Sequence, residues 1–127
     1  MYVYYNPNPF GKQVGDCVIR AICKIMHLTW DEAYTAICLR GFDMKDMPAS
    51  NSVWGSYLVS KGFRSHLLPD RCPNCYTVKN FCEEYCKGYY LLATGAHVIA
   101  IVNGDYYDAW DSGDEIPILY WERKEHD

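Results

Sequence analysis

The chain has 127 residues, half of them hydrophobic, and is long enough to bury an ordinary core without help from disulfides or a metal ion. Its net charge of −4 and its scattered Lys and Arg residues offer no basic field to a phosphate backbone, so we expect no nucleic-acid partner. No apolar run approaches the roughly 20 residues of a membrane span, and no signal-peptide pattern opens the chain. We therefore expect one cytoplasmic domain over residues 1–127, without membrane contact.

The first two thirds of the chain predict mainly helices. Proline, asparagine and glycine in residues 6–11 indicate a loop that leads to Cys17. From Cys17 onward, apolar residues recur at helical spacing, with Arg20 and Lys24 on the opposite face. Later helices are indicated by capping residues at Thr29 and Thr77 and by a terminating glycine. The predicted helices span residues 17–27, 29–39, 51–61 and 77–88.

The last third predicts strands, because short runs rich in β-branched and aromatic residues alternate with Gly, Asn and Asp. Asn103-Gly104 between two such runs is a strong hairpin signal. Helices followed by an antiparallel meander favour an α+β fold, with N-terminal helices packed on a C-terminal antiparallel sheet. The predicted strands span residues 63–69, 89–93, 97–102, 106–110 and 116–121.

Cys17 is the candidate nucleophile because it opens a predicted helix. The unsatisfied N–H groups and the dipole at a helix N-terminus lower the pKa of a thiol, and the thiolate is the reactive form. Gly15-Asp16 before the cysteine suits an exposed elbow, since glycine permits close approach and an acid complements the dipole. The alternative is a small buried residue in the helix core.

His97 is the candidate base, because it opens the most apolar strand of the chain. A two-residue turn at Asn103-Gly104 places Trp110 opposite His97 and brings two aspartates close to it. We expect Asp111 to orient the imidazole, with a one-residue bulge bringing it level. Asp108 is the competing candidate for that role.

Three segments carry a resemblance to a known family: residues 8–22 around Cys17, 97–104 around His97, and 107–112 around Asp111. Together they resemble small papain-like proteins of bacteria and their phages, related to the C39-type peptidases. The resemblance implies a papain-like fold and a cysteine peptidase, or an amide or isopeptide hydrolase, that forms an acyl-thioester on Cys17. It also implies a peptide or protein substrate and no cofactor.

The chain departs from the papain-like pattern at the oxyanion hole. The glutamine that supplies one donor usually stands six residues before the cysteine, and Gly11 occupies that position here. Gln13, or alternatively Asn8, is left to complete the hole. If neither does so, the chain is a catalytically weak or inactive papain-like module that binds a protein partner.

The seven cysteines also permit a structural zinc site. Cys72, Cys75, Cys82 and Cys86 form a Cys-x-x-Cys pair followed by a pair four residues apart, and four thiolates would close a tetrahedral site. The competing interpretation is that Cys82 and Cys86 are small hydrophobic residues on one helix face. We expect no catalytic metal in either case.

Overall fold

The computed structural model describes residues 1–69, 71 and 74–123. Within these residues the chain forms an α+β fold of four helices and one six-stranded sheet. The helices are α1 (Cys17–Met26), α2 (Trp30–Met44), α3 (Asn51–Ser60) and α4 (Val78–Glu84). The strands are β1 (Tyr2–Tyr4), β2 (Phe63–Leu67), β3 (Tyr89–Ala93), β4 (Val98–Val102), β5 (Asp105–Asp108) and β6 (Leu119–Arg123).

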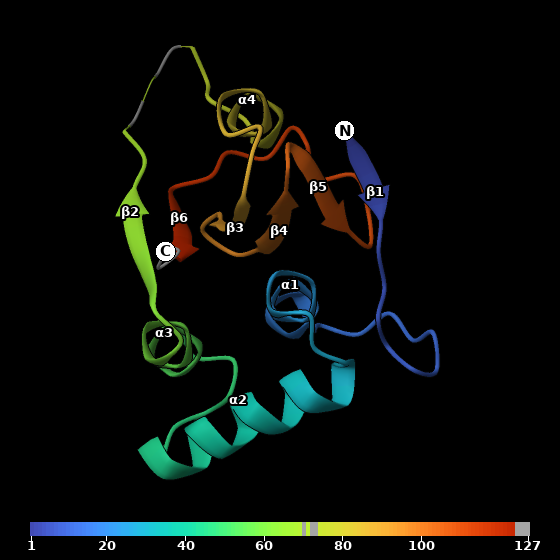
Figure 1. Ribbon diagram of the computed structural model, residues 1–127, viewed down its shortest axis with the longest axis vertical. Coiled ribbons are helices and arrows are strands. Elements are labelled where there is room, and N and C mark those ends of the chain that lie inside the picture. The colour runs from blue at the N-terminus through green and yellow to red at the C-terminus, as the bar shows by residue number, and fades with distance from the viewer. Residues whose placement is uncertain (70, 72–73, 124–127) are drawn as a thin grey trace.

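The sheet separates two layers of helices. Its strand order is β1-β5-β4-β3-β6-β2, with β4 near the centre. Figure 1 shows α4 above the sheet and α1 below it, with α2 and α3 beyond α1. Since both faces are covered, every residue of β4 is buried.

Side-chain alternation along β4 divides the core into two clusters. Val98 and Ala100 pack with the buried residues of α1, α2 and α3. Ile99 and Ile101 pack with Phe81 and other residues on the α4 side of the sheet. The start of β4 and the start of α1 thus meet at the edge of the first cluster.

The predicted α+β class is confirmed, but the sheet differs from the predicted C-terminal antiparallel meander. Residues 2–4, which the sequence does not predict as a strand, form β1 and pair in parallel with β5. Strand β6 lies beside β3 rather than beside β5. The Asn103-Gly104 hairpin is as predicted, with positive φ at both residues and Val102 paired to Asp105.

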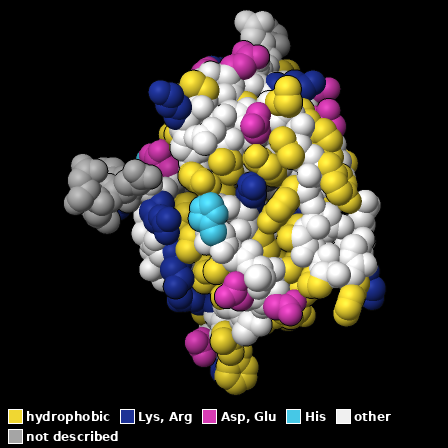
Figure 2. All heavy atoms as spheres, turned by 45° about the vertical axis from the view of Figure 1, so that its right-hand side comes forward, with side chains coloured by type: hydrophobic (Ala, Val, Ile, Leu, Met, Phe, Trp, Pro, Cys, Tyr) yellow, Lys and Arg dark blue, Asp and Glu magenta, His cyan; other side chains and the backbone are white. Residues whose placement is uncertain are grey.

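The described surface carries mixed charges. On the face in Figure 2, hydrophobic side chains lie across the middle, and Lys, Arg, Asp and Glu are distributed around them. In the part of the chain that the structure describes, no helix is both long enough and apolar enough to cross a bilayer.

Candidate functional site

Cys17 is the first residue of α1, as predicted, and is partly buried. The first intrahelical bond runs from the N–H of Arg20 to the carbonyl of Asp16. The N–H groups of the first turn before Arg20 therefore have no partner within the helix. The Asp16 side chain, which stands at the N-cap position, does not cap them. The thiol thus lies beside a group of N–H donors.

His97 lies at the end of a tight turn between β3 and β4. The turn residues are Gly95 and Ala96, and the Thr94 N–H donates to the His97 carbonyl at 2.8 Å. The imidazole is nearly buried, with 7% of the residue exposed. Its Nε2 atom bonds to Asp108 Oδ2 at 2.6 Å. The other ring nitrogen, Nδ1, is not engaged by Asp108, and His97 and Cys17 lie close enough for each to shift the pKa of the other.

Asp108, the last residue of β5, is fully buried and uses both carboxylate oxygens. Oδ2 accepts from His97 Nε2 and, at 2.7 Å, from the Ser112 hydroxyl. Oδ1 accepts from Arg20 Nη2 at 2.9 Å and from the Ala109 N–H at 2.8 Å. Four donors fix this carboxylate and so fix the orientation of the imidazole that it holds.

The prediction that Asp111 holds the imidazole is wrong. Asp111 is exposed, and its Oδ1 accepts from the Tyr106 hydroxyl at 2.5 Å and from the Gly113 N–H at 3.0 Å. These bonds lower the pKa of Asp111, with the Tyr106 bond contributing most. The residue that contacts His97 is Asp108, the competing candidate.

The alternation of strand side chains explains the error. The register of β4 and β5, extended by three pairs, places Trp110 opposite His97, as the sequence predicts. Asp108 stands two residues before Trp110 and shares its side of the strand, whereas Asp111 alternates to the other side. No bulge is needed once Asp108 is recognised as the partner.

Arg20 is the principal residue that the sequence analysis missed. It is predicted on the polar face of its helix, yet only 3% of it is exposed. Its Nη1 atom bonds to Asp16 Oδ1 at 2.7 Å, and its Nη2 atom bonds to Asp108 Oδ1 at 2.9 Å. The second oxygen of Asp16 accepts from Trp30 Nε1 at 2.9 Å. The four-residue spacing of Asp16 and Arg20 was the available signal, since such pairs meet on a helix.

Trp110 covers the imidazole. The rings of Trp110 and His97 are stacked, with centroids 4.3 Å apart and planes at 27°. The Arg20 guanidinium carbon lies 5.7 Å from the centroid of the same indole. With about half of its surface exposed, Trp110 forms a wall between solvent and the bond from His97 to Asp108. Excluding water strengthens that bond.

The pKa values of the three groups shift together. Burial raises the pKa of the Cys17 thiol, but bonds from the His97 ring and the Val98 N–H, together with the charges of His97 and Arg20, bring it below its usual value. Burial lowers the pKa of His97, but Asp108 and Cys17 outweigh this and raise it to about 9. Burial raises the pKa of Asp108, but the bonds from His97, Ser112 and the Ala109 N–H, together with the His97 charge, bring it below its usual value. The arrangement thus favours the charged form of each group: the thiolate of Cys17, the imidazolium of His97 and the carboxylate of Asp108.

Cys17 and His97 line a cleft of about 610 Å³. The cleft lies between the first turn of α1, helices α2 and α3, the turn before β4, and the start of β6. Its walls include the aromatic residues Trp30, Tyr34, Trp54 and Trp121. This volume falls within the usual range for ligand sites. Cys17 and His97 are therefore open to a bound molecule.

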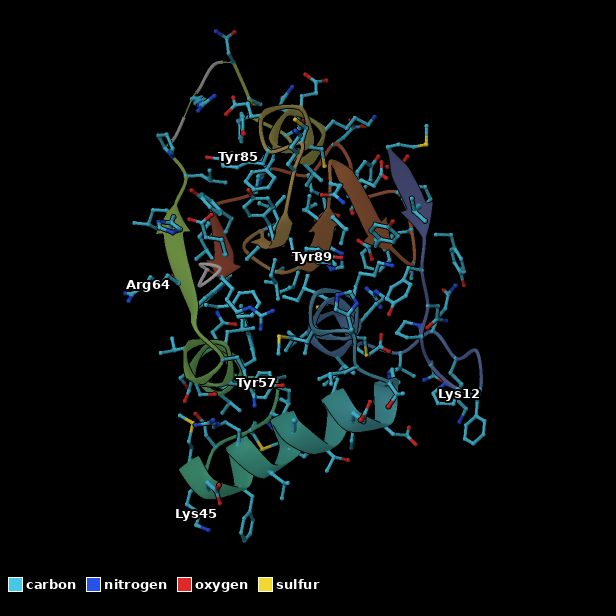
Figure 3. The ribbon with its side chains drawn as sticks, viewed as in Figure 1. Lys12, Lys45, Tyr57, Arg64, Tyr85 and Tyr89 are labelled. Atoms are coloured by element: carbon cyan, nitrogen blue, oxygen red, sulfur yellow. The ribbon has the colours of Figure 1, made fainter. Side chains whose placement is uncertain are left out.

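The predicted oxyanion donors do not reach this cleft. Gln13 is exposed, and neither it nor Asn8 is among the described residues that line the cleft. Asn8 Oδ1 instead accepts from the N–H groups of Phe10 and Lys12. Lys12, the neighbour of Gln13, lies at the outer edge of the molecule (Figure 3).

Three of the four cysteines predicted as zinc ligands are among the described residues. Cys72 lies outside the described residues. Cys75 and Cys86 are exposed, whereas Cys82 is buried beside Phe81, and burial raises its pKa to about 11. Among the described residues, no group of three or more His, Cys, Asp or Glu side chains is arranged to hold a metal ion.

No family model, curated protein or solved structure matches this chain.

Proposed function

We propose that the chain is a papain-like cysteine peptidase, or an amide or isopeptide hydrolase, with Cys17 as nucleophile. One observation carries the proposal. Cys17 and His97 line the same open cleft, each shifts the pKa of the other, and the His97 ring bonds to buried Asp108 at 2.6 Å. Nucleophile, base and orienting acid in this sequence order also match the papain-like pattern that the sequence resembles, with Asp108 in place of Asp111.

The reaction follows from the protonation states. The Cys17 thiolate adds to the amide carbon, and the carbonyl π electrons move to oxygen to form an oxyanion. Collapse of this intermediate breaks the C–N bond, and the amine leaves with the proton that His97 Nδ1 donates. His97 then removes a proton from water, whose oxygen attacks the thioester. The acid is released, and the thiolate and imidazolium form again.

The oxyanion needs hydrogen-bond donors beside the thiol. The N–H of Cys17 supplies one, and the N–H groups of Val18 and Ile19 are further donors in the same first turn. Asp16 does not occupy these donors with its side chain. Gln13 and Asn8 therefore need no role in this mechanism.

The cleft walls favour a substrate with bulky apolar groups. Trp121 lies in T-shaped contact with Trp54, their ring centroids 6.1 Å apart. The Trp121 Nε1 atom is buried and has no partner among the described residues. A peptide carbonyl beside an apolar side chain would satisfy this donor while covering the aromatic walls. We therefore expect peptides with aromatic or large aliphatic residues near the cleaved bond to bind best.

The first experiment exposes the protein to a low concentration of chloroacetamide at pH 6 and maps the adduct by mass spectrometry. We expect the label on Cys17, ahead of the exposed Cys75 and Cys86, because Cys17 has contacts that lower the pKa of its thiol. A Cys17→Ala control should lose this label. Label confined to Cys75 and Cys86 would contradict the proposal.

The second experiment tests turnover on a mixture of peptides that differ in their apolar residues. The products are compared for the wild type and for Cys17→Ser and His97→Ala variants. Cleavage that depends on both residues supports a hydrolase. Cleavage that survives in Cys17→Ser would contradict it.

A non-catalytic papain-like module is the second candidate. It is favoured by the position of Gln13 and Asn8, which leaves the oxyanion to backbone donors alone. This candidate predicts selective labelling of Cys17 without cleavage of any peptide in the mixture. Retention of an intact peptide ligand by the wild type, and its loss when Trp54→Ala alters the cleft, would favour binding over hydrolysis.

A further inference from the structure

Arg20 holds two buried carboxylates at once. It lies one turn beyond Cys17 on α1, and its two terminal nitrogens bond separately to Asp16 and Asp108. The side chains of the three charged residues are each at most 5% exposed. One guanidinium thus joins the start of α1 to the end of β5, directly behind the thiol and the imidazole.

Arg20 and His97 bond to different oxygens of the Asp108 carboxylate. Arg20 bonds to Oδ1, whereas His97 bonds to Oδ2. The arginine therefore neutralises much of the carboxylate charge without competing for the oxygen that holds the imidazole. A buried carboxylate that lacks such a partner would tend to take up a proton.

The Asp16 contact keeps a second carboxylate away from the helix amides. Aspartate at an N-cap position ordinarily accepts from the N–H groups of the first turn. Thr29 and Thr77, at the N-caps of α2 and α4, do so in this chain. The Asp16 oxygens instead bond to Arg20 and Trp30. The amides beside the Cys17 sulfur consequently remain available to a negative charge.

We propose that Arg20 is a positioning residue of the Cys17 and His97 pair: by holding Asp108 at one oxygen and Asp16 away from the helix amides, it preserves the environment in which the thiolate forms. The proposal rests on the function proposed above. Arg20 does not touch the reacting atoms and acts through the two aspartates.

The charged and titratable groups that face this cluster come from several elements. Helix α1 provides Arg20, with Asp16 just before it, and the turn before β4 provides His97. Strand β5 provides Asp108, and the Tyr2 phenol of β1 donates to the Asp108 carbonyl at 3.2 Å. Helix α2 contributes the neutral indole of Trp30. Arg20 is thus the permanent positive charge among these groups, since the charge of His97 depends on its proton.

The test measures how the alkylation rate of Cys17 by iodoacetamide depends on pH, because the midpoint of this profile reports the thiolate pKa. In Arg20→Gln, Asp16 is free to approach the helix amides and a positive charge is lost, so we expect the midpoint to rise. At pH 6 we expect the rate to fall about tenfold or more. In Asp16→Asn, a negative charge is lost beside the sulfur, and we expect the midpoint to fall. The double variant should lie between the two.

The midpoint is expected to rise in Arg20→Gln and to fall in Asp16→Asn, and these opposite shifts distinguish a positioning role from a merely structural one. If Arg20 and Asp16 served only to join elements, both variants would disturb reactivity in the same direction together with stability. Such a result, or an unchanged midpoint in folded Arg20→Gln, overturns the proposal. Ile101→Val, in the cluster on the far side of the sheet, is the control that lowers stability without moving the midpoint. If Arg20→Gln does not fold, Asp16→Asn and Arg20→Lys still test the expected shifts of the midpoint. Arg20→Lys is suitable because a lysine ammonium keeps the positive charge without spanning both carboxylates.

The wild-type profile distinguishes the two proposals. A wild-type midpoint at the value of an ordinary free thiol contradicts the proposed function, and the inference falls with it. A low wild-type midpoint that the Arg20 and Asp16 variants leave unchanged contradicts the role of Arg20 alone.

Discussion

Cys17 and Cys23 lie on the same helix, six residues apart, and their thiols differ in opposite directions from an ordinary cysteine. Cys23 is buried in the core, and burial, with a contribution from the Asp16 charge, raises its pKa to about 12. Burial acts on Cys17 in the same sense, but bonds from His97 and Val98, together with the charges of His97 and Arg20, outweigh it and lower the pKa. Burial alone therefore raises the pKa of a thiol, and the bonds and charges at the helix start lower the pKa of the other.

His97→Ala should produce the largest change, because it removes the partner that most distinguishes Cys17 from Cys23. We expect the alkylation rate of Cys17 at pH 6 to fall roughly 100-fold, as the thiolate fraction falls. Peptide hydrolysis should also be lost, since His97 transfers the proton in the proposed mechanism. The rate is followed by mass spectrometry of the Cys17 peptide.

Cys23→Ala is the matched control on the same helix. It should leave the Cys17 rate unchanged, because Cys23 packs in the core. An equal loss of Cys17 reactivity in the control and in His97→Ala would mean that the helix, rather than the imidazole, governs the thiol.

The next largest effect is expected for Asp108→Asn, and Asp111→Asn is the variant with which it is compared. Asparagine at position 108 removes the charge that raises the pKa of His97, and it leaves buried Arg20 with one carboxylate instead of two. We expect about a tenfold or greater loss of Cys17 reactivity and a loss of roughly 3 kcal/mol in the free energy of unfolding. Asp111→Asn should change reactivity little, because Asp111 bonds to Tyr106 at the surface. A larger loss of reactivity in Asp111→Asn than in Asp108→Asn would instead support the sequence-based prediction that Asp111 orients His97.

The pH dependence of folding stability tests the opposite pKa shifts of His97 and Cys17. The folded-state pKa of His97 is about 9, above its ordinary value of 6.5, so its stabilising effect is present below about pH 6.5 and is lost as the pH rises to about 9. The lowered pKa of Cys17 acts oppositely, because the unfolded chain then holds the proton on the thiol. The proton that Cys17 releases on folding is the proton that His97 takes up. We therefore expect the wild-type free energy of unfolding to change less over this range than the His97 shift alone would give.

Cys17→Ser removes one side of this compensation. Asp108 still raises the pKa of His97 in this variant, so its free energy of unfolding should fall by roughly 1 kcal/mol between pH 6.5 and 9. Urea titrations at several pH values measure the effect. Cys23→Ser should retain the shallower profile of the wild type. A wild-type profile as steep as that of Cys17→Ser would argue against a lowered Cys17 pKa.

Much of the fold could be predicted from local signals. Capping residues, helical spacing and the Asn103-Gly104 turn correctly indicated the helices and the central strands. Strand β1 was missed because it is only three residues long and depends on pairing with β5 near the other end of the chain. The position of β6 beside β3 is also a long-range property that no local pattern encodes.

The candidate site was predictable only where it depends on local position. Cys17 at a helix start and His97 at a strand start are local features, and the hairpin register placed Trp110 correctly. The choice between Asp108 and Asp111 required the side-chain alternation to be followed past the end of the strand. Arg20 has the spacing of a polar helix face, and its burial depends on two aspartates that only the tertiary fold brings together.

Gln13→Ala should have the smallest effect and tests whether backbone donors suffice. Gln13 is exposed outside the cleft, so this variant should keep the wild-type alkylation rate of Cys17 and, for any cleaved peptide, its rate of hydrolysis. Loss of one oxyanion donor typically lowers turnover about 100-fold or more, an effect that is easily measured. Unchanged alkylation with a large loss of hydrolysis would mean that the loop before α1 moves when substrate binds and brings the Gln13 amide to the oxyanion. The difference between Cys17 and Cys23 would then account for the reactive thiol but only for part of the catalytic site.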